Sequence, residues 1–224
     1  MRRASRSIGA GASVGGIIVS VSNDEVYASG LLNRALDPGT QPEAIRAFMQ
    51  AEIDLLDDIV TDTTAWLDVG CGTGRHLALL RARVRLGVGV DYEQAYVIAA
   101  HRNAGGSPLH FITADATRLP LSPDFDLATC MTNTWGTMND KHGVLAEMRR
   151  CARRRVVSVF SERSSAARRE WYRRFGHPVI EESAEWLMTE GGLRSEHFTE
   201  ARLRALIGDC TMYPCTDIGY IVRF

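Results

Sequence analysis

The stretch WLDVGCGTGRH, residues 66–76, carries three glycines on alternate positions, with Asp-Val before them and Arg-His after them. Glycines between a strand and a helix let a ligand approach the backbone, because no Cβ stands in the way. The dinucleotide pattern GxGxxG would need a glycine where this chain has Arg75. No Gly-Lys-Ser/Thr follows, so the P-loop pattern is absent as well. The loop predicts a cofactor site of another kind.

Two carboxylates follow the next expected strands and suit an adenosine. Asp91 ends the run GVGVD, and Asp115 follows the third run in TADA. An ionised carboxylate accepts two hydrogen bonds, so Asp91 can hold both hydroxyls of a ribose. Asp115 can accept a hydrogen bond from an exocyclic amine of adenine, while the next backbone N–H, that of Ala116, serves a ring nitrogen. Together with the loop, they predict an adenosine site without a phosphate cradle.

These residues need a sheet that brings their strand ends to one edge. Short apolar runs alternate with helical patterns, which is typical of a parallel sheet with right-handed crossovers. The expected strands are 65–69, 86–90, 109–113, 125–131 and 156–160. Two further strands, 211–215 and 219–224, are joined by a turn too short for a helix and should pair antiparallel. The expected fold is α/β: a doubly wound, Rossmann-like, seven-stranded, mostly parallel sheet with an antiparallel C-terminal strand.

The chain before this sheet has two expected parts. Residues 1–22 read as a flexible tail, with a weak export signal as the alternative, because a basic start precedes a mildly apolar stretch. Residues 23–63 are expected to form a helical N-terminal lid. Its helix would start at a capping box, Thr40–Glu43, and end near Thr61. The sheet domain would then cover 64–224, with a small hairpin insertion near 184–198.

Composition restricts the classes of partner. The chain has 224 residues, 45% of them hydrophobic and 24% charged, and a net charge of −1. Such a balance points neither to nucleic acid nor to an acidic membrane, and no run approaches the roughly 20 apolar residues of a membrane span. The five cysteines show no CxxC spacing. They argue against a zinc or disulfide scaffold and favour a reduced, cytoplasmic protein, with no metal expected.

The ordered motifs resemble those of class I S-adenosylmethionine-dependent methyltransferases. The segments that carry the resemblance are LDVGCGTGRH, GVDY, ADATRLPL and FDLATCMTNTW, which together cover roughly residues 64–162. The resemblance implies S-adenosyl-L-methionine as cofactor and S-adenosyl-L-homocysteine as product. The cofactor-binding residues that we expect are Asp68, Gly70, Cys71, Gly72, Gly74, Asp91, Tyr92, Asp115, Ala116, Thr132, Asn133 and Trp135.

The resemblance also assigns these residues to parts of the cofactor. Asp68 and the loop 70–74 would face its methionine part, and Tyr92 would lie against adenine. The segment 132–135 would lie beside the amino-acid moiety and the reactive sulfonium. The two strand-end carboxylates keep the ribose and adenine roles given above. Each residue also has a structural alternative, since a carboxylate can cap a turn and Tyr92 can simply pack.

The methyl acceptor is expected above the carboxyl ends of the strands, where parallel sheets bind ligands. Methyl transfer from a sulfonium is an in-line displacement, so alignment and exclusion of water supply much of the catalysis. A deprotonated amine needs little more, whereas a hydroxyl usually needs a base or a metal. The chain shows no metal-ligand spacing and no obvious catalytic dyad. His197, next to Glu196, is the best candidate for a general base.

Several classes of acceptor stay open. The segment CMTNTWGTMND is loosely similar to the loop of small-amine N-methyltransferases of the glycine/sarcosine type, which favours a small-molecule acceptor and mildly an amine nitrogen. An O-methyltransferase of a small hydroxylated metabolite is the main alternative. Two arginine-rich runs, 149–155 and 168–174, raise an RNA methyltransferase, against which the net charge argues. A module that binds the cofactor without transferring methyl is the last alternative, and the sequence predicts no oligomeric state.

Overall fold

The computed structural model describes residues 12–14, 17–19, 34–104 and 106–224. The predicted flexible tail therefore lies mostly outside the described residues, as does the first part of the predicted lid. Within the tail, β1 (Ala12–Val14) and β2 (Ile17–Val19) pair antiparallel. In the part of the chain that is described, no helix combines the length and the apolar character that a bilayer crossing requires.

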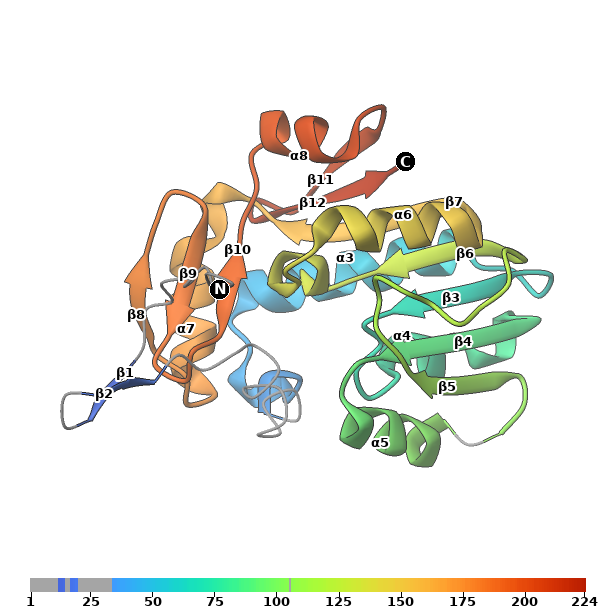
Figure 1. Ribbon diagram of the computed structural model, residues 1–224, viewed down its shortest axis with the longest axis horizontal. Helices are drawn as coiled ribbons and strands as arrows, with labels where there is room; N and C mark the ends of the chain where they lie inside the picture. Colours follow the sequence, from blue (N-terminus) through green and yellow to red (C-terminus); the bar gives the residue numbers. More distant parts are fainter. Residues whose placement is uncertain (1–11, 15–16, 20–33, 105) are drawn as a thin grey trace, which may run out of the picture.

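A seven-stranded sheet forms the centre of the molecule, in the order β11-β12-β7-β6-β3-β4-β5 (Figure 1). β12 pairs antiparallel with both of its neighbours, and the other pairs are parallel. This confirms the predicted fold class. The strands are β3 (Ala65–Val69), β4 (Leu86–Asp91), β5 (Leu109–Thr113), β6 (Phe125–Cys130), β7 (Ala152–Phe160), β11 (Thr211–Cys215) and β12 (Gly219–Arg223).

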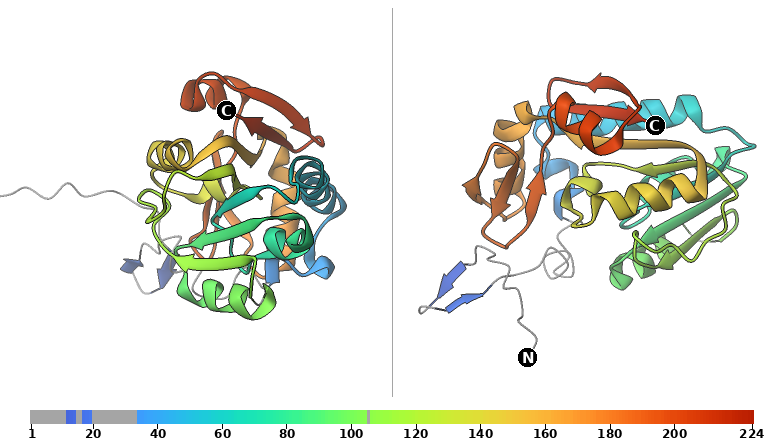
Figure 2. Two further views of the ribbon diagram at one scale, coloured as in Figure 1. Left: turned by 90° about the vertical axis from the view of Figure 1, so that its right-hand side faces the viewer. Right: turned by 45° about the horizontal axis from the view of Figure 1, so that its top comes forward.

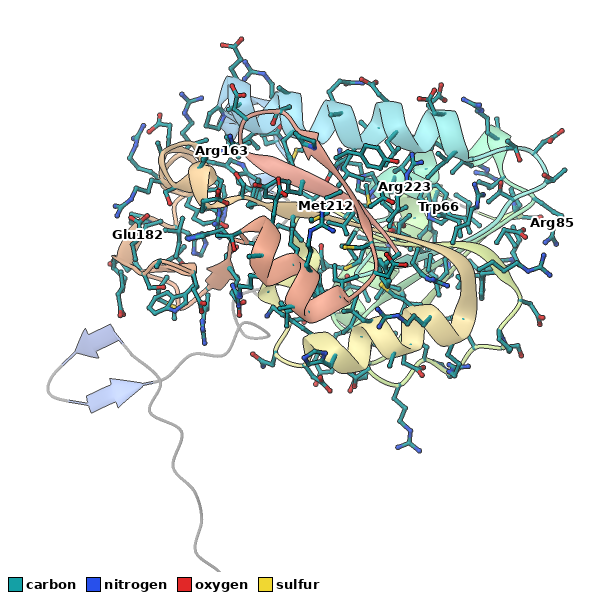
Figure 3. All side chains as sticks on the ribbon, turned by 90° about the horizontal axis from the view of Figure 1, so that it is seen from above. Trp66, Arg85, Arg163, Glu182, Met212 and Arg223 are labelled. Atoms are coloured by element: carbon teal, nitrogen blue, oxygen red, sulfur yellow. The ribbon has the colours of Figure 1, made fainter. Side chains whose placement is uncertain are left out.

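Helices cover both faces of this sheet. Figure 3 shows α3 and α6 along opposite faces. Alternate residues of β3 enter the two cores: Trp66 packs in the cluster with α3, and Leu67 in the cluster with α6. The first face carries α3 (Glu43–Ile59), α4 (Arg75–Leu79), α5 (Gln94–Ala104) and α7 (Ser165–Arg174), and the second carries α6 (Lys141–Cys151) and α8 (Glu200–Ile207). Short 3-10 turns are η1 (Pro38–Thr40), η2 (Arg81–Arg83), η3 (Thr134–Thr137) and η4 (Glu162–Ser164).

A second, three-stranded antiparallel sheet stands at one end of the molecule. It contains β8 (Val179–Glu182), β9 (Trp186–Thr189) and β10 (Arg194–Glu196). The hairpin expected near 184–198 corresponds to β9 and β10, and β8 adds a strand that the sequence pattern did not predict. Figures 1 and 2 show this sheet beside α7, at the end toward which the parallel strands of the main sheet point.

One local prediction was wrong, that of the capping box at the start of α3. The hydroxyl of Thr40 does not cap α3 but donates to the carbonyl oxygens of Arg34 and Asp37, because Thr40 belongs to a separate turn. The residue before α3 is Pro42, whose side chain offers no cap. The arginine run 149–155 is divided between two elements, because α6 ends at Cys151 and β7 begins at Ala152.

Candidate functional site

A cavity of about 500 Å³ opens at the carboxyl ends of β3, β4, β5 and β6. The loops after these strands line one side of it, and α7 with β10 lines another. The structure brings ten of the residues expected from the sequence to this one space. They are Asp68, Gly70, Cys71, Gly72, Asp91, Tyr92, Asp115, Ala116, Thr132 and Asn133.

Two other expected residues lie behind the lining. Gly74 has a φ of +78° and begins α4; a Cβ there would lie 2.8 Å from the ring of Phe111, so this glycine serves helix–sheet packing. Trp135 is completely buried, and its ring stacks on Phe198 at 5.2 Å. Its Nε1 donates to the carbonyl oxygen of Lys141. The side chain of Trp135 therefore braces the loop after β6 from behind.

His197 does not line the cavity. Its ring is buried, with Nε2 at 3.0 Å from the carbonyl oxygen of Ala184 and Nδ1 at 3.3 Å from the guanidinium of Arg168. Burial, followed by the nearby positive charge of Arg168, lowers the pKa of His197. These contacts give the imidazole a structural environment, and a role as general base gains no support from its position.

The glycine loop is fastened to the end of β4. The amides of Gly70 and Cys71 both donate to the carbonyl oxygen of Val90, at 2.7 and 2.9 Å. The amide of Gly72 donates to Oδ2 of Asp91 at 2.8 Å, and Oδ1 accepts from the amide of Glu93 at 2.9 Å. Burial raises the pKa of Asp91, although these two backbone donors oppose the shift. The carboxylate of Asp91 thus holds the glycine loop in shape and also lines the cavity.

Substituting Gly70 tests whether this loop tolerates a side chain. Gly70 has a φ of +71°, and an added Cβ would overlap Cγ2 of Thr134. Gly176 has a similar φ of +90° with nothing within 4 Å of an added Cβ. We expect Gly176→Ala to cost about 1 kcal/mol from backbone strain and Gly70→Ala about 2 kcal/mol or more, because it adds the overlap. Urea unfolding of both variants measures this, and equal losses would contradict the steric argument.

Asp68 presents a buried carboxylate at the floor of the cavity. Its Oδ1 accepts a hydrogen bond of 2.7 Å from the hydroxyl of Thr129. Its Oδ2 is buried without a hydrogen-bond partner in the described structure, and the nearest cationic nitrogen is Nδ1 of His76 at 3.8 Å. A buried carboxylate oxygen without a donor is costly. This position suits a ligand that brings an ammonium group.

A buried polar cluster beneath the cavity was missed by sequence reasoning. Its centre is Glu52 of α3, which is completely buried. Glu52 accepts hydrogen bonds from the amide and hydroxyl of Thr132, at 2.6 and 2.7 Å, and from the hydroxyl of Ser158. Nitrogen atoms of Arg75 and His76 lie at 3.5 and 3.6 Å from its Oε2. The cluster ties α3 to the loops that line the site.

One sequence signal pointed to this cluster. Glu52 occupies the apolar face of α3, three residues after Met49 and four before Leu56, both of which are buried. A carboxylate on the core face of an amphipathic helix is rare unless it is paired. The sequence does not tell which residues pair with Glu52, because its partners come from α4, the loop after β6 and β7, which are all distant from it in the sequence.

The cluster holds opposite charges next to each other. Burial alone would lower the pKa of His76, but the adjacent carboxylates of Asp68 and Glu52 outweigh it and raise the pKa. Burial likewise would raise the pKa of Glu52, and the contacts with His76 and Arg75 outweigh it and lower the pKa. Nη2 of Arg75 also lies 2.8 Å from Nε2 of His76, so the imidazole stands between a guanidinium and two carboxylates.

The raised pKa of His76 predicts a pH-dependent stability. Its contribution is complete below the ordinary value of 6.5 and is lost as pH rises through the raised pKa. Glu52 contributes above its ordinary value of 4.5, and that part is lost as pH falls through its lowered pKa. We expect the stability difference between wild type and His76→Gln to be largest between these two values and to shrink toward pH 9. Urea unfolding from pH 5 to 9 measures it, with the exposed His110→Gln as control. A pH-independent difference would contradict the assignment.

Comparison with known proteins identifies related domains. Residues 67–155 match the model of a family described as methyltransferase domain. A search of curated proteins finds no match. A solved structure from Pyrococcus horikoshii is 18% identical, with a TM-score of 0.64, and the match covers 82% of this chain and 92% of that one.

Two further solved structures are similar. An S-adenosylmethionine-dependent methyltransferase from Clostridium acetobutylicum is 13% identical, with a TM-score of 0.60 over 89% of this chain and 99% of that one. The magnesium protoporphyrin IX methyltransferase of Synechocystis, solved with bound S-adenosylhomocysteine, is 16% identical, with a TM-score of 0.60 over 88% and 93%. At these identities the likeness is one of fold.

Proposed function

We propose that this chain, whose residues 67–155 match a methyltransferase-domain family, is a class I S-adenosylmethionine-dependent methyltransferase that moves the methyl group of that cofactor to a small-molecule acceptor. The observation that carries the proposal is that Asp68, Asp91 and Asp115, from the ends of three strands, line a single cavity together with the glycine loop. One end of that cavity suits the cofactor, and its remaining wall is apolar and enclosed by α7.

The described residues fit the cofactor. The unpartnered Oδ2 of Asp68 would accept a hydrogen bond from its ammonium group. Gly70 and Gly72 keep the loop free of side chains where the methionine part would lie. Asp91 would hold the ribose hydroxyls. Tyr92, which is 65% exposed, is free to cover adenine.

The edge of adenine would meet Asp115 and Ala116. Oδ1 of Asp115 accepts hydrogen bonds from the amide and hydroxyl of Thr117, at 2.8 and 2.7 Å. These bonds fix the orientation of the carboxylate at the mouth of the cavity. The carboxylate retains acceptor capacity for an exocyclic amine, because each oxygen accepts more than one hydrogen bond.

When bound, the cofactor supplies a methyl group already attached to a good leaving group, so the chain's task is to bind, align and exclude water. Alignment would come from the loop after β6, whose residue Thr132 is fixed by Glu52. His76 is the only histidine among the described residues that line the cavity, and the neighbouring carboxylates raise its pKa. Its Nε2 contacts Arg75 and Glu52, and its Nδ1 faces Asp68, so neither ring nitrogen is free to act as a base toward an acceptor. This supports an amine nitrogen over a hydroxyl as acceptor.

Solved structures of similar fold differ in their acceptors. One is the 1,6-didemethyltoxoflavin N1-methyltransferase of Burkholderia thailandensis, 18% identical with a TM-score of 0.60, which was crystallised with that compound and S-adenosylhomocysteine. The Synechocystis protein described above acts on a magnesium porphyrin by its name. Both are small-molecule enzymes by their names, which supports the small-molecule proposal without selecting a compound. O-methylation is the second candidate.

The test has a binding arm and a transfer arm. Calorimetry should show S-adenosylhomocysteine binding to the purified chain with no comparable binding of NAD. Methyl-labelled cofactor should then label compounds of an amine and phenol panel, with bulk RNA as a further arm. Binding of NAD alone would refute the cofactor assignment. Label in RNA but in no small molecule would refute the acceptor assignment.

A further inference from the structure

The far side of the cavity is an aromatic surface formed by Phe160 at the end of β7 and Trp171, Tyr172 and Phe175 on and after α7. We call these four residues the aromatic wall. Trp171 lies 5.6 Å from Tyr172 and 5.4 Å from Phe175 between ring centroids, and 6.3 Å from Phe160. Each ring is almost completely enclosed by its neighbours. The wall is therefore a continuous packed surface with only parts of its rings turned to the cavity.

The wall is held in place before any ligand arrives. Nε1 of Trp171 donates to the carbonyl oxygen of Ala35 at 3.1 Å, and the phenol oxygen of Tyr172 accepts from Arg168 at 3.4 Å. Ala35 and Leu36 themselves line the cavity. A rigid apolar surface of this kind gains most from a flat ring that packs against it, because such packing displaces water without ordering the protein further.

Aromatic surfaces also attract ammonium ions, but the charges around this wall oppose that use. The guanidinium carbon of Arg168 lies 4.9 Å from the ring centroid of Phe160 and 5.6 Å from that of Tyr172. Arg168 is completely buried, so its charge is weakly screened. Arg75 adds a guanidinium in the lining itself. A cationic acceptor would be repelled from this end of the cavity.

The nearby carboxylates do not restore an attraction for cations. Glu52 is engaged by Arg75, His76 and hydroxyl donors. Asp68 lies at the cofactor end, where the ammonium group of the cofactor would occupy its free oxygen. The charges next to the aromatic wall therefore favour a neutral acceptor over a cationic one. The acceptor must also carry an available lone pair without first losing a proton, because both ring nitrogens of His76, the imidazole in the lining, are already engaged by Arg75, Glu52 and Asp68.

Resting on the proposed function, we infer that the acceptor is a small, neutral, planar aromatic nitrogen compound, an arylamine or a nitrogen heterocycle, which packs against the aromatic wall. Its nitrogen lone pair forms the new N–C bond to the methyl carbon. The C–S bond breaks, and its electron pair stays on sulfur as a neutral thioether. Where the nitrogen carried a hydrogen, that proton leaves to water afterwards, so the step needs no base from the chain.

A set of matched compounds tests this acceptor class. The first arm contains neutral arylamines and heterocycles such as aniline and quinoline. The others are a protonated arylalkylamine (benzylamine), a protonated aliphatic amine (cyclohexylamine) and phenols. With S-adenosylhomocysteine present, we expect the first arm to bind at least ten-fold more tightly than the others, and with labelled cofactor to receive the methyl group. Equal or better binding and transfer for benzylamine, cyclohexylamine or the phenols would overturn the inference.

Variants of the wall separate this inference from the proposed function. In Trp171→Leu we expect the KM of the best arylamine to rise at least ten-fold, while the Kd of S-adenosylhomocysteine stays within two-fold. Phe175→Leu should act in the same direction if the first variant folds poorly. Trp186→Leu on β9, outside the cavity lining, is the matched control. An unchanged KM in both wall variants refutes the wall's role. Absence of S-adenosylhomocysteine binding in the wild type would instead refute the proposed function.

Discussion

Replacing Glu52 by alanine should lower the free energy of unfolding by about 3–5 kcal/mol, the range found when one partner of a buried ion pair is removed. Glu52 is completely buried and accepts hydrogen bonds from Thr132 and Ser158. Its loss would leave the imidazole of His76 and the guanidinium of Arg75 with one carboxylate fewer beside them. The penalty arises from these uncompensated charges more than from the cavity that a missing side chain creates.

The same substitution should also weaken cofactor binding. Thr132 lines the cavity, and its amide and hydroxyl both donate to Glu52. Thr132 has a φ of +53°, a conformation that an ordinary residue keeps only when its surroundings hold it there. Without Glu52, we expect the loop after β6 to lose this conformation, so S-adenosylhomocysteine should bind more weakly even under conditions in which the variant is folded.

Urea unfolding measures the stability, and calorimetry measures the affinity for S-adenosylhomocysteine. Glu43→Ala is the matched control, because Glu43 is exposed in the first turn of the same helix and should change stability by less than about 1 kcal/mol. Glu52→Gln keeps the shape and part of the hydrogen bonding, so it should fall between the two. A Glu52→Ala protein as stable as the control would show that the cluster does not hold α3 to the site.

The strands were predictable because each is a short apolar run that turn residues bound on both sides. The bounds of β3, β5 and β11 agree with those expected from the sequence, since local composition alone determines them. β7 begins earlier than the sequence pattern predicted. Its first part contains the exposed Arg153 and Arg154, whereas the residues from Val156 on are buried and gave the apolar signal. Backbone pairing with β6 makes this charged segment a strand, although its composition does not predict one.

The meeting of the strand-end carboxylates at one cavity was predictable from the sequence, whereas the contacts of Glu52 and the position of the aromatic wall were not. Asp68 and Asp91 lie at the ends of β3 and β4, and Asp115 follows β5, so the parallel topology itself brings them together. Glu52 and Thr132 are 80 residues apart, and no local pattern pairs them. The sequence also does not predict whether the side chain of a loop residue points into the cavity or into the core. Trp135 belongs to an expected cofactor segment, yet its indole turns into the core beside Phe198.

Residues of the aromatic wall were hidden by their neighbours in the sequence. Trp171 and Tyr172 stand between charged residues in a run that suggested nucleic-acid binding. In α7, helical periodicity places Arg168, Trp171 and Tyr172 on the buried face and the other arginines on the outer face. Arg169, Arg173 and Arg174 form ion pairs with Glu182 or Glu170. Arg168 turns inward and packs against the same rings. The arginines of α7 are therefore engaged within the chain, which weakens the RNA alternative.

Asp91→Ala should weaken the binding of S-adenosylhomocysteine by about 1.5–3 kcal/mol, from the loss of charge-assisted hydrogen bonds. That range corresponds to a roughly 10- to 150-fold rise in Kd. The carboxylate has two functions in this structure. It faces the cavity, and it accepts hydrogen bonds from the amides of Gly72 and Glu93, so its removal would both free the glycine loop and take away the proposed ribose acceptor.

Asp91→Asn separates these two functions. The amide oxygen can still accept from one backbone amide, but the side chain now offers one acceptor oxygen and no negative charge, so its hold on two ribose hydroxyls is weakened. We expect its Kd to lie close to that of Asp91→Ala if the ribose contact dominates, and close to wild type if the carboxylate mainly shapes the loop. Asp124→Ala, at an exposed turn, is the control and should leave the Kd unchanged. Calorimetry with S-adenosylhomocysteine decides among these outcomes, and a wild-type Kd in Asp91→Ala would remove Asp91 from the cofactor site.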